Sequence, residues 1–362
     1  MLFRIITKEN FKQLVDIILE SNEVIGPKVV GEDRRGRAIH QYLPVEGFDQ
    51  IDLGYETTEY SAKTYFLPFK ETICSYGCAD GDWEQELRYR IQPRAIVGLH
   101  ACDINALVRL DKVLGRDRFP SPYYLSRRRN TFIVGIDHEP CEGAFCHSLG
   151  TDTVTHGFDL FITDIGERYF VAIDSDRAFQ LLQRVAVAEV TEPDRREYLR
   201  TRRQISERFA EDLDFQNVPN LLDIEFESEV WQRWGDKCFS CGSCAMVCPT
   251  CYCYGVVEEI SMDYEQAAKV RQLHSCNLID FARVAGGHNF RPTARSRLKY
   301  RFYHQHRGFV ETYESPMCVG CNRCGRSCLA GINPVDVIRD LQTEDAKSPA
   351  AAPQAGEARV RR

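Results

Sequence analysis

No run of about 18 consecutive apolar residues occurs in this sequence of 362 residues, so it contains no candidate for a membrane-spanning helix. Met1 to Thr7 also lack the charged leader and long apolar segment that begin a secretory signal peptide. We therefore expect a cytoplasmic protein. In that reducing compartment, cysteines bind metal as thiolates more often than they form disulfides.

An excess of positive charge is also missing. Lysine and arginine total 46 against 53 for aspartate and glutamate, which gives a formal net charge of −7. A polyanion such as nucleic acid is therefore not the expected partner.

Motifs of nucleotide binding and hydrolytic catalysis are absent as well. No G-x-G-x-x-G sequence follows a predicted strand, so nothing recognisable would cradle a dinucleotide. No Ser/His/Asp arrangement or pair of carboxylates stands out. We expect any FAD or NAD(P) that serves this protein to be bound by a partner subunit.

Cysteine, in contrast, is abundant, with 16 residues. Eight of them form two runs with the spacing C-x2-C-x2-C-x3-C. These are Cys238, Cys241, Cys244 and Cys248, followed by Pro249, and then Cys318, Cys321, Cys324 and Cys328. Bacterial ferredoxins with two clusters use this spacing, and the fourth cysteine of each run binds the other cluster. We predict that these eight cysteines hold two [4Fe-4S] clusters.

The spacing between the cysteines has a physical reason. Small and turn-forming residues such as Gly242 and Gly320 let a tight loop wrap around a cluster, with its amide groups directed at sulfur. Four thiolates also hold structural zinc, which is the alternative interpretation. Zinc, however, does not need a third cysteine at the next two-residue step, and both runs contain one.

The role of the other eight cysteines stays open. They are Cys74, Cys78, Cys102, Cys141 and Cys146 in the first part of the chain, and Cys251, Cys253 and Cys276 between the two runs. Cys102 and Cys141 to Cys146 follow two predicted strands, where α/β sheets present their functional loops. A further metal site is one interpretation, and buried, unreactive thiols are the other.

Hydrophobic patterns predict an α/β N-terminal domain. Apolar residues at helical spacing between Phe11 and Leu19 predict a helix that packs on a core. A strand at residues 95–99, a helix capped by Asp103 and a strand at residues 131–136 form a βαβ unit, which predicts a parallel or mixed sheet. Residues 158–173 predict a hairpin added to it.

We predict three parts of the chain. Residues 1–220 form the α/β domain, which would dock partners, and residues 221–343 form a mainly α-helical, ferredoxin-like dicluster domain. Residues 344–362 are rich in alanine, proline, glycine and charge, and are expected to be a disordered tail. The charged segment at residues 193–214 is expected to be a solvated helix near the domain boundary.

Residues 283–309 are rich in arginine and aromatic residues. Alone, this segment resembles an RNA-binding stripe. Because it lies between two halves of one predicted metal domain, we expect its arginines to offset thiolate charge or to contact an acidic partner surface.

The sequence around the cysteines resembles a known family. The residues CFSCGSCAMVCPTCYC at Cys238 to Cys253, Arg291-Pro292, and CVGCNRC at Cys318 to Cys324 are similar to the dicluster β subunits of cytoplasmic nickel-iron sulfhydrogenases and to the A subunit of anaerobic sulfite reductases. Ala101-Cys102-Asp103 and Gly157 to Leu160 are similar too. The resemblance covers most of residues 60 to 340.

This resemblance implies an electron-transfer subunit of a multisubunit oxidoreductase. In that family, the subunit relays single electrons between a flavoprotein that oxidises NAD(P)H and a catalytic hydrogenase or sulfur or sulfite reductase subunit. Two alternatives are a self-sufficient iron-sulfur flavoenzyme and an interaction module stiffened by metal. The sequence leaves open the terminal substrate, the choice between NADH and NADPH, and the stoichiometry of the complex.

Overall fold

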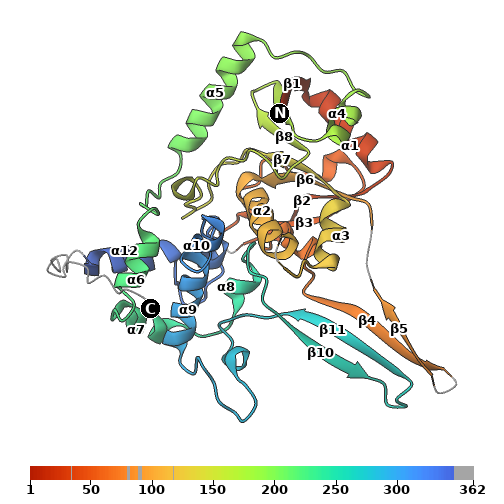
Figure 1. Ribbon diagram of the computed structural model, residues 1–362. Coiled ribbons are helices and arrows are strands. Elements are labelled where there is room, and N and C mark those ends of the chain that lie inside the picture. Colours follow the sequence, from red (N-terminus) through yellow and green to blue (C-terminus); the bar gives the residue numbers. More distant parts are fainter. Residues whose placement is uncertain (34, 80–81, 89–91, 117, 346–362) are drawn as a thin grey trace, which may run out of the picture.

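The main layer of the fold is a seven-stranded mixed sheet with the strand order β1-β9-β8-β7-β6-β2-β3 (Figure 1). In that order the strands are Leu2–Thr7, Arg168–Ile173, Leu160–Asp164, Thr131–Ile136, Arg94–His100, Glu23–Glu32 and Ala38–Val45. Strands β8, β7, β6 and β2 are parallel, and β1, β9 and β3 are antiparallel to their neighbours. The computed structural model describes residues 1–33, 35–79, 82–88, 92–116 and 118–345.

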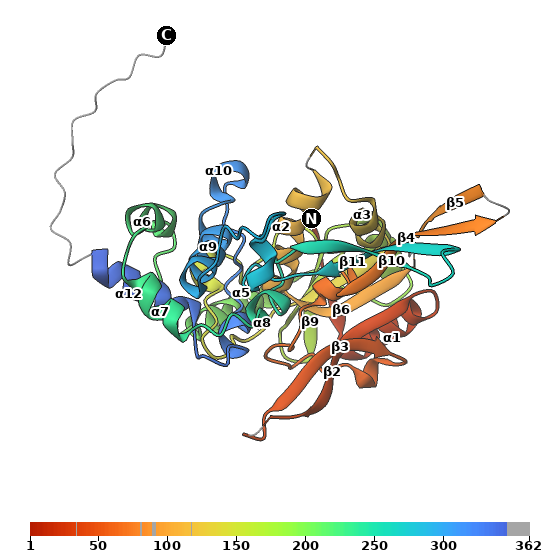
Figure 2. The same ribbon diagram turned by 90° about the horizontal axis from the view of Figure 1, so that it is seen from below.

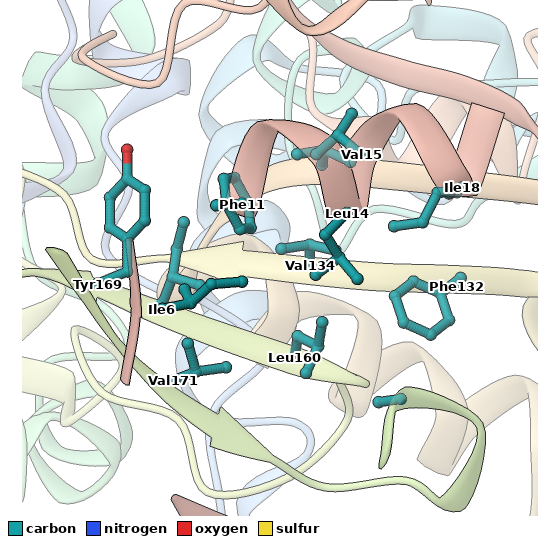
Figure 3. Packing of buried hydrophobic residues seen from close by; sticks show 14 of the residues in the cluster. Ile6, Phe11, Leu14, Val15, Ile18, Phe132, Val134, Leu160, Tyr169 and Val171 are labelled. Atoms are coloured by element: carbon teal, nitrogen blue, oxygen red, sulfur yellow. The ribbon is translucent and has the colours of Figure 1, made fainter. Parts of the chain in front are cut away.

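Helix α1 (Lys8–Leu19) covers one face of this sheet, as its apolar spacing predicts. The side chain of Thr7 caps the helix by accepting a hydrogen bond from the Asn10 amide. The buried residues of the helix are Phe11, Leu14, Val15 and Ile18. Figure 3 shows this helix lying over the strands, with Leu14 directed toward Val134 and Leu160.

The other face of the sheet is covered by α2 (Ala101–Gly115) and α3 (Pro122–Arg129), which connect the parallel strands β6 and β7. Ile96 and Ile133 pack on this side, whereas Val97 and Val134 pack with α1. The predicted βαβ unit is confirmed. The predicted cap is wrong, because α2 begins at Ala101 after His100, and Asp103 lies buried in its first turn.

The predicted hairpin is confirmed as the antiparallel pair β8 and β9. It leads through α4 (Asp176–Leu182) to α5 (Glu192–Glu207). The predicted solvated helix is α5, where Asp194 alone is buried as part of a capping box with Thr191.

A second sheet, which the sequence did not predict, has the order β10-β11-β4-β5 and projects from the body of the molecule (Figure 2). Its strands are Tyr254–Ile260, Gln266–Leu273, Lys70–Ala79 and Asp82–Leu87. At its base, the buried carboxylate of Glu71 binds Arg271 of β11 and Arg127 of α3. Because β4 pairs with β11, this sheet joins residues from both sides of residue 220. The division of the chain at that residue stays a prediction.

The C-terminal part is mainly helical, as predicted. Its helices are α6 (Val218–Ile224), α7 (Val230–Lys237), α8 (Ser243–Met246), α9 (Ala294–His306), α10 (Val310–Tyr313), α11 (Arg323–Arg326) and α12 (Pro334–Asp345). Short 3-10 turns occur at Phe48–Gln50, Ala62–Tyr65, His147–Leu149 and Ile279–Ala282. Trp231 and Phe302 lie in the core that these helices share.

Helix α12 runs to Asp345, and residues 346–362, the rest of the predicted tail, lie outside the described residues. Within the described part of the chain, no helix has both the length and the apolar character needed to cross a bilayer.

Candidate metal centre

The eight cysteines of the two runs line one cavity of about 920 Å³, a volume that includes solvent at its mouth. The structure therefore brings together every residue that the sequence predicted as a cluster ligand. The wall between the cysteines is largely apolar, with Leu298, Phe302 and Ile332 among its residues.

The two runs fold alike. In each, the residue two positions after the first cysteine has a positive φ, 54° at Ser240 and 69° at Gly320. The amide of each of these residues donates to the sulfur of the first cysteine at 3.4 Å. Gly242 and Asn322, at φ 83° and 51°, then precede the one-turn helices α8 and α11. Two loops of the same shape thus present their first three thiols in the same way.

Glycine is required at Gly320 for space as well as for its φ. A Cβ atom at this position would lie 2.6 Å from the backbone of Phe145 and Cys146. The carbonyl of Gly320 accepts a hydrogen bond from the Phe145 amide at 2.8 Å. The second run is therefore held against a loop of the N-terminal domain.

Cys248, the fourth cysteine of the first run, lies near thiols of both runs. Burial raises the pKa of Cys318 to about 12, and Cys324 and Cys248 act in the same direction. Burial likewise raises the pKa of Cys324 to about 11, where Arg301 opposes the shift and Cys248 adds to it. Burial also raises the pKa of Cys244, and Cys248 acts in the same direction, so the crossed pairing of the fourth cysteines stays a prediction.

Two buried cations lie beside these thiols. The guanidinium Nη1 of Arg301 is 3.3 Å from the sulfur of Cys251, and the Nζ of Lys63 donates to the carbonyl of Cys251 at 2.9 Å. Burial lowers the pKa of Lys63, while Cys251 and Cys248 act in the opposite direction. Positive charge in a buried site stabilises thiolates and any anionic group that they hold.

The arginine-rich segment thus has two roles in the structure. Arg301 and Arg297 point into the protein, where Arg297 donates to the hydroxyl of Ser240 at 2.9 Å, in the first cysteine run. Lys299 and Arg307 instead pair with Glu227 and Asp223 at the surface. The expectation that this segment offsets thiolate charge fits Arg301.

The second run is also anchored by a buried ion pair. Arg323 of α11 donates to both carboxylate oxygens of Asp103 at 2.6 and 2.7 Å, and both side chains are 2% exposed. The same guanidinium donates to the carbonyl and hydroxyl oxygens of Thr58. Asp103 and Thr58 belong to the N-terminal domain, so this pair links the two halves of the chain.

One side of the cavity reaches the surface. Cys241 is exposed, and Phe239 and Leu329, which also line the cavity, are 69% and 80% exposed. Exposed apolar side chains at the rim of a buried site are typical of a surface that a partner covers.

The eight thiols fit four-iron clusters better than single metal ions. Around one tetrahedral zinc ion, sulfur atoms bound at 2.3 Å would lie about 3.8 Å apart. All sixteen cysteines are among the described residues, and none of them forms a disulfide. Among the eight sulfurs that line the cavity, no three lie within 4.8 Å of one another. Widely spaced thiols around a shared cavity suit a larger group with several metal atoms.

Sequence reasoning missed Lys63 and His138. Lys63 lies 188 residues before the carbonyl that it binds, and no local pattern indicates that contact. His138 comes shortly after a predicted strand, beside Cys102 and Cys146 in space, and its position at a strand end was an available signal. Cys251 lies next to Cys248, whereas Cys74 and Cys78 belong to the second sheet.

Comparison with known proteins matches both parts of the chain. Residues 237–332, which contain all eight cysteines, match the family model described as a 4Fe-4S dicluster domain. Over 341 residues the chain is 33% identical to sulfhydrogenase 2 subunit beta of Pyrococcus furiosus. That match covers 92% of this chain and 96% of the relative, so it extends well beyond the cysteine runs.

Proposed function

The chain belongs to the sulfhydrogenase beta subunit family, and from this premise we propose that it relays electrons between an NAD(P)H-oxidising flavoprotein subunit and a catalytic subunit of the hydrogenase or sulfur or sulfite reductase type. Family membership and the dicluster domain support an electron-transfer role. The relative is a subunit of a sulfhydrogenase, so we place the FAD, the NAD(P) site and the catalytic centre on partner chains.

The ligand assignment is part of this proposal. One [4Fe-4S] cluster would be held by Cys238, Cys241, Cys244 and Cys328, and the other by Cys318, Cys321, Cys324 and Cys248. The observation that carries the proposal is the single cavity that all eight of these cysteines line. Bound clusters would supply one-electron redox chemistry there.

The protein's own residues prepare the site for such groups. The amides of Ser240 and Gly320 direct N–H groups at sulfur, and Arg301 and Lys63 place positive charge beside the thiols. The apolar core around Phe302 excludes water from the inner wall. The directed amides and the positive charges lower the free energy of a negatively charged group here, and they offset the cost of burying it in an apolar site.

Metal and spectroscopic measurements on the anaerobically purified chain test the assignment. We expect about eight irons and eight acid-labile sulfides per chain, and an EPR spectrum of two interacting reduced clusters. Replacement Cys324→Ser should lower the iron content and remove that interaction. Cys74→Ser is the matched control, because Cys74 is buried but belongs to the second sheet. Colourless protein that contains zinc would contradict the proposal, and flavin bound to the single chain would favour a self-sufficient flavoenzyme.

The open side of the cavity is the proposed contact for one partner subunit. We expect Phe239→Asp to weaken co-purification of a partner chain at least several-fold while the iron content stays unchanged, because a charge at the rim opposes apolar contact. Phe119→Asp is the control, since Phe119 is 82% exposed but does not line the cavity. Equal loss of the partner in both variants would show that the rim is not the contact.

A further inference from the structure

A second group of metal-binding side chains lies outside the cavity. One ligand atom each from Cys102, His138 and Cys146 lies within 4.8 Å of the others, and all three residues are buried. Cys102 lies in the first turn of α2 directly after β6, and His138 follows β7. Because β6 and β7 are parallel neighbours, their carboxyl ends meet at one edge of the sheet and bring these residues together.

The surroundings of this group give the imidazole little to bind. Cys102 and Cys146 belong to a buried cluster with Ala106, Ala144 and Val319. His138 is 9% exposed, and its buried Nδ1 atom has no hydrogen-bond partner among the described residues. A buried polar atom without a partner is unfavourable, and such atoms in native structures often mark a missing ion or water.

We propose that Cys102, His138 and Cys146 bind one divalent transition-metal ion of the zinc type. Two thiolates and an imidazole are ligands that select zinc over hard cations such as magnesium. Both thiols lose a proton when the ion binds, so binding releases two protons.

The distances between the ligand atoms distinguish this site from the cluster cavity. The three ligand atoms here all lie within 4.8 Å of one another, whereas no three of the eight sulfurs in the cavity do. Around a single tetrahedral ion with bonds of about 2.0 to 2.3 Å, ligand atoms lie about 3.3 to 3.8 Å apart. The tight group therefore fits one ion, and the wide groups fit clusters.

The site is placed to hold the loop of the second cysteine run. The thiol of Cys146 contacts the carbonyl of Gly320 at 3.5 Å, and the hydroxyl of Thr151 donates to the carbonyl of Val319 at 2.7 Å. An ion bound to Cys146 would replace the thiol proton and tie this loop, whose Phe145 amide donates to the carbonyl of Gly320, to β6 and β7. Cys141 belongs to the same buried cluster but lies outside the tight group, so it is not among the three assigned ligands.

Elemental analysis of the anaerobically purified full-length chain tests the proposal. We expect one zinc per chain in addition to the iron, and X-ray absorption at the zinc edge should show two sulfur ligands and at least one nitrogen ligand. In Cys102→Ser and Cys146→Ser, zinc should fall at least tenfold while iron and sulfide stay unchanged. His138→Cys supplies another zinc ligand and should retain the metal, whereas His138→Ala should not. Cys74→Ser is again the control.

Two results would overturn this assignment without touching the proposed relay function. One is wild-type protein with its full iron content and no zinc. The other is loss of about four irons and four sulfides from the Cys102 and Cys146 variants, which would mean that these residues hold a cluster. Loss of iron only when a cysteine of the cavity is replaced would bear on the proposed electron relay and not on the proposed zinc site.

Discussion

Replacement of Asp103 by leucine is expected to lower the free energy of unfolding by about 3 to 5 kcal/mol, because it leaves the charge of Arg323 buried without its partner. Both side chains are 2% exposed, and the guanidinium makes two short hydrogen bonds to the carboxylate. Thr58 supplies only neutral oxygen atoms to the same guanidinium, so it cannot replace the lost charge. Urea unfolding of the anaerobically purified protein, followed by circular dichroism, measures the change.

The same helix offers a control for this prediction. Arg326, one turn further along α11, pairs with Glu56 at 3.9 Å, and Glu56 is 62% exposed. We expect Glu56→Leu to cost less than about 1 kcal/mol, because water screens this pair. The double replacement Asp103→Leu with Arg323→Met should recover part of the loss. If Asp103→Leu destabilised no more than Glu56→Leu, the buried pair would not be what joins the two halves of the chain.

The sequence predicted elements whose signals are local. The spacing of the eight cysteines determines how each loop can wrap, so the ligand positions follow from about a dozen residues in each run. The apolar face of α1 and the buried strands β6 and β7 carry strong periodic patterns, and they formed where expected.

These local patterns do not predict contacts between distant segments of the chain. Strand β5 is exposed along its whole length and β10 along most of it, so neither shows the alternation that marks a half-buried strand. Their sheet forms because β4 pairs with a strand nearly two hundred residues later. Asp103 looked like a helix cap because its partner, Arg323, is 220 residues away.

At the candidate site too, the sequence predicts features that depend on local patterns but not contacts between distant residues. Cys102 and Cys146 both follow predicted strands, so a shared metal site is one interpretation of the sequence. His138 also follows a predicted strand, but its contact with Cys102 and Cys146 depends on how close two strand ends lie in space. Arg301 was one of several arginines in a basic segment, and only the fold distinguishes it from those at the surface.

Replacement of Arg301 by glutamine is expected to make the reduction potentials of the bound clusters more negative by about 90 mV. Burial acts against the charge of Arg301, yet the thiols of Cys244, Cys251 and Cys248 keep its pKa raised, so this residue stays positive. Reduction adds negative charge, which a nearby cation stabilises, and losing that cation disfavours reduction. A unit charge acting over roughly 8 Å at an effective dielectric constant of about 20 contributes about 2 kcal/mol. For a one-electron couple, this energy corresponds to about 90 mV.

The effect should extend to both clusters, because Arg301 lies near Cys244, assigned to one cluster, and near Cys248 and Cys324, assigned to the other. Redox titration followed by EPR measures the two potentials, with iron content measured in parallel. Arg301→Lys keeps the charge and should restore most of the potential, a result that a purely structural role would not give. Arg295→Gln, on the same helix but paired with Glu227 at the surface, should leave both potentials unchanged. If glutamine and lysine at position 301 gave equal potentials, packing rather than charge would be the contribution of Arg301.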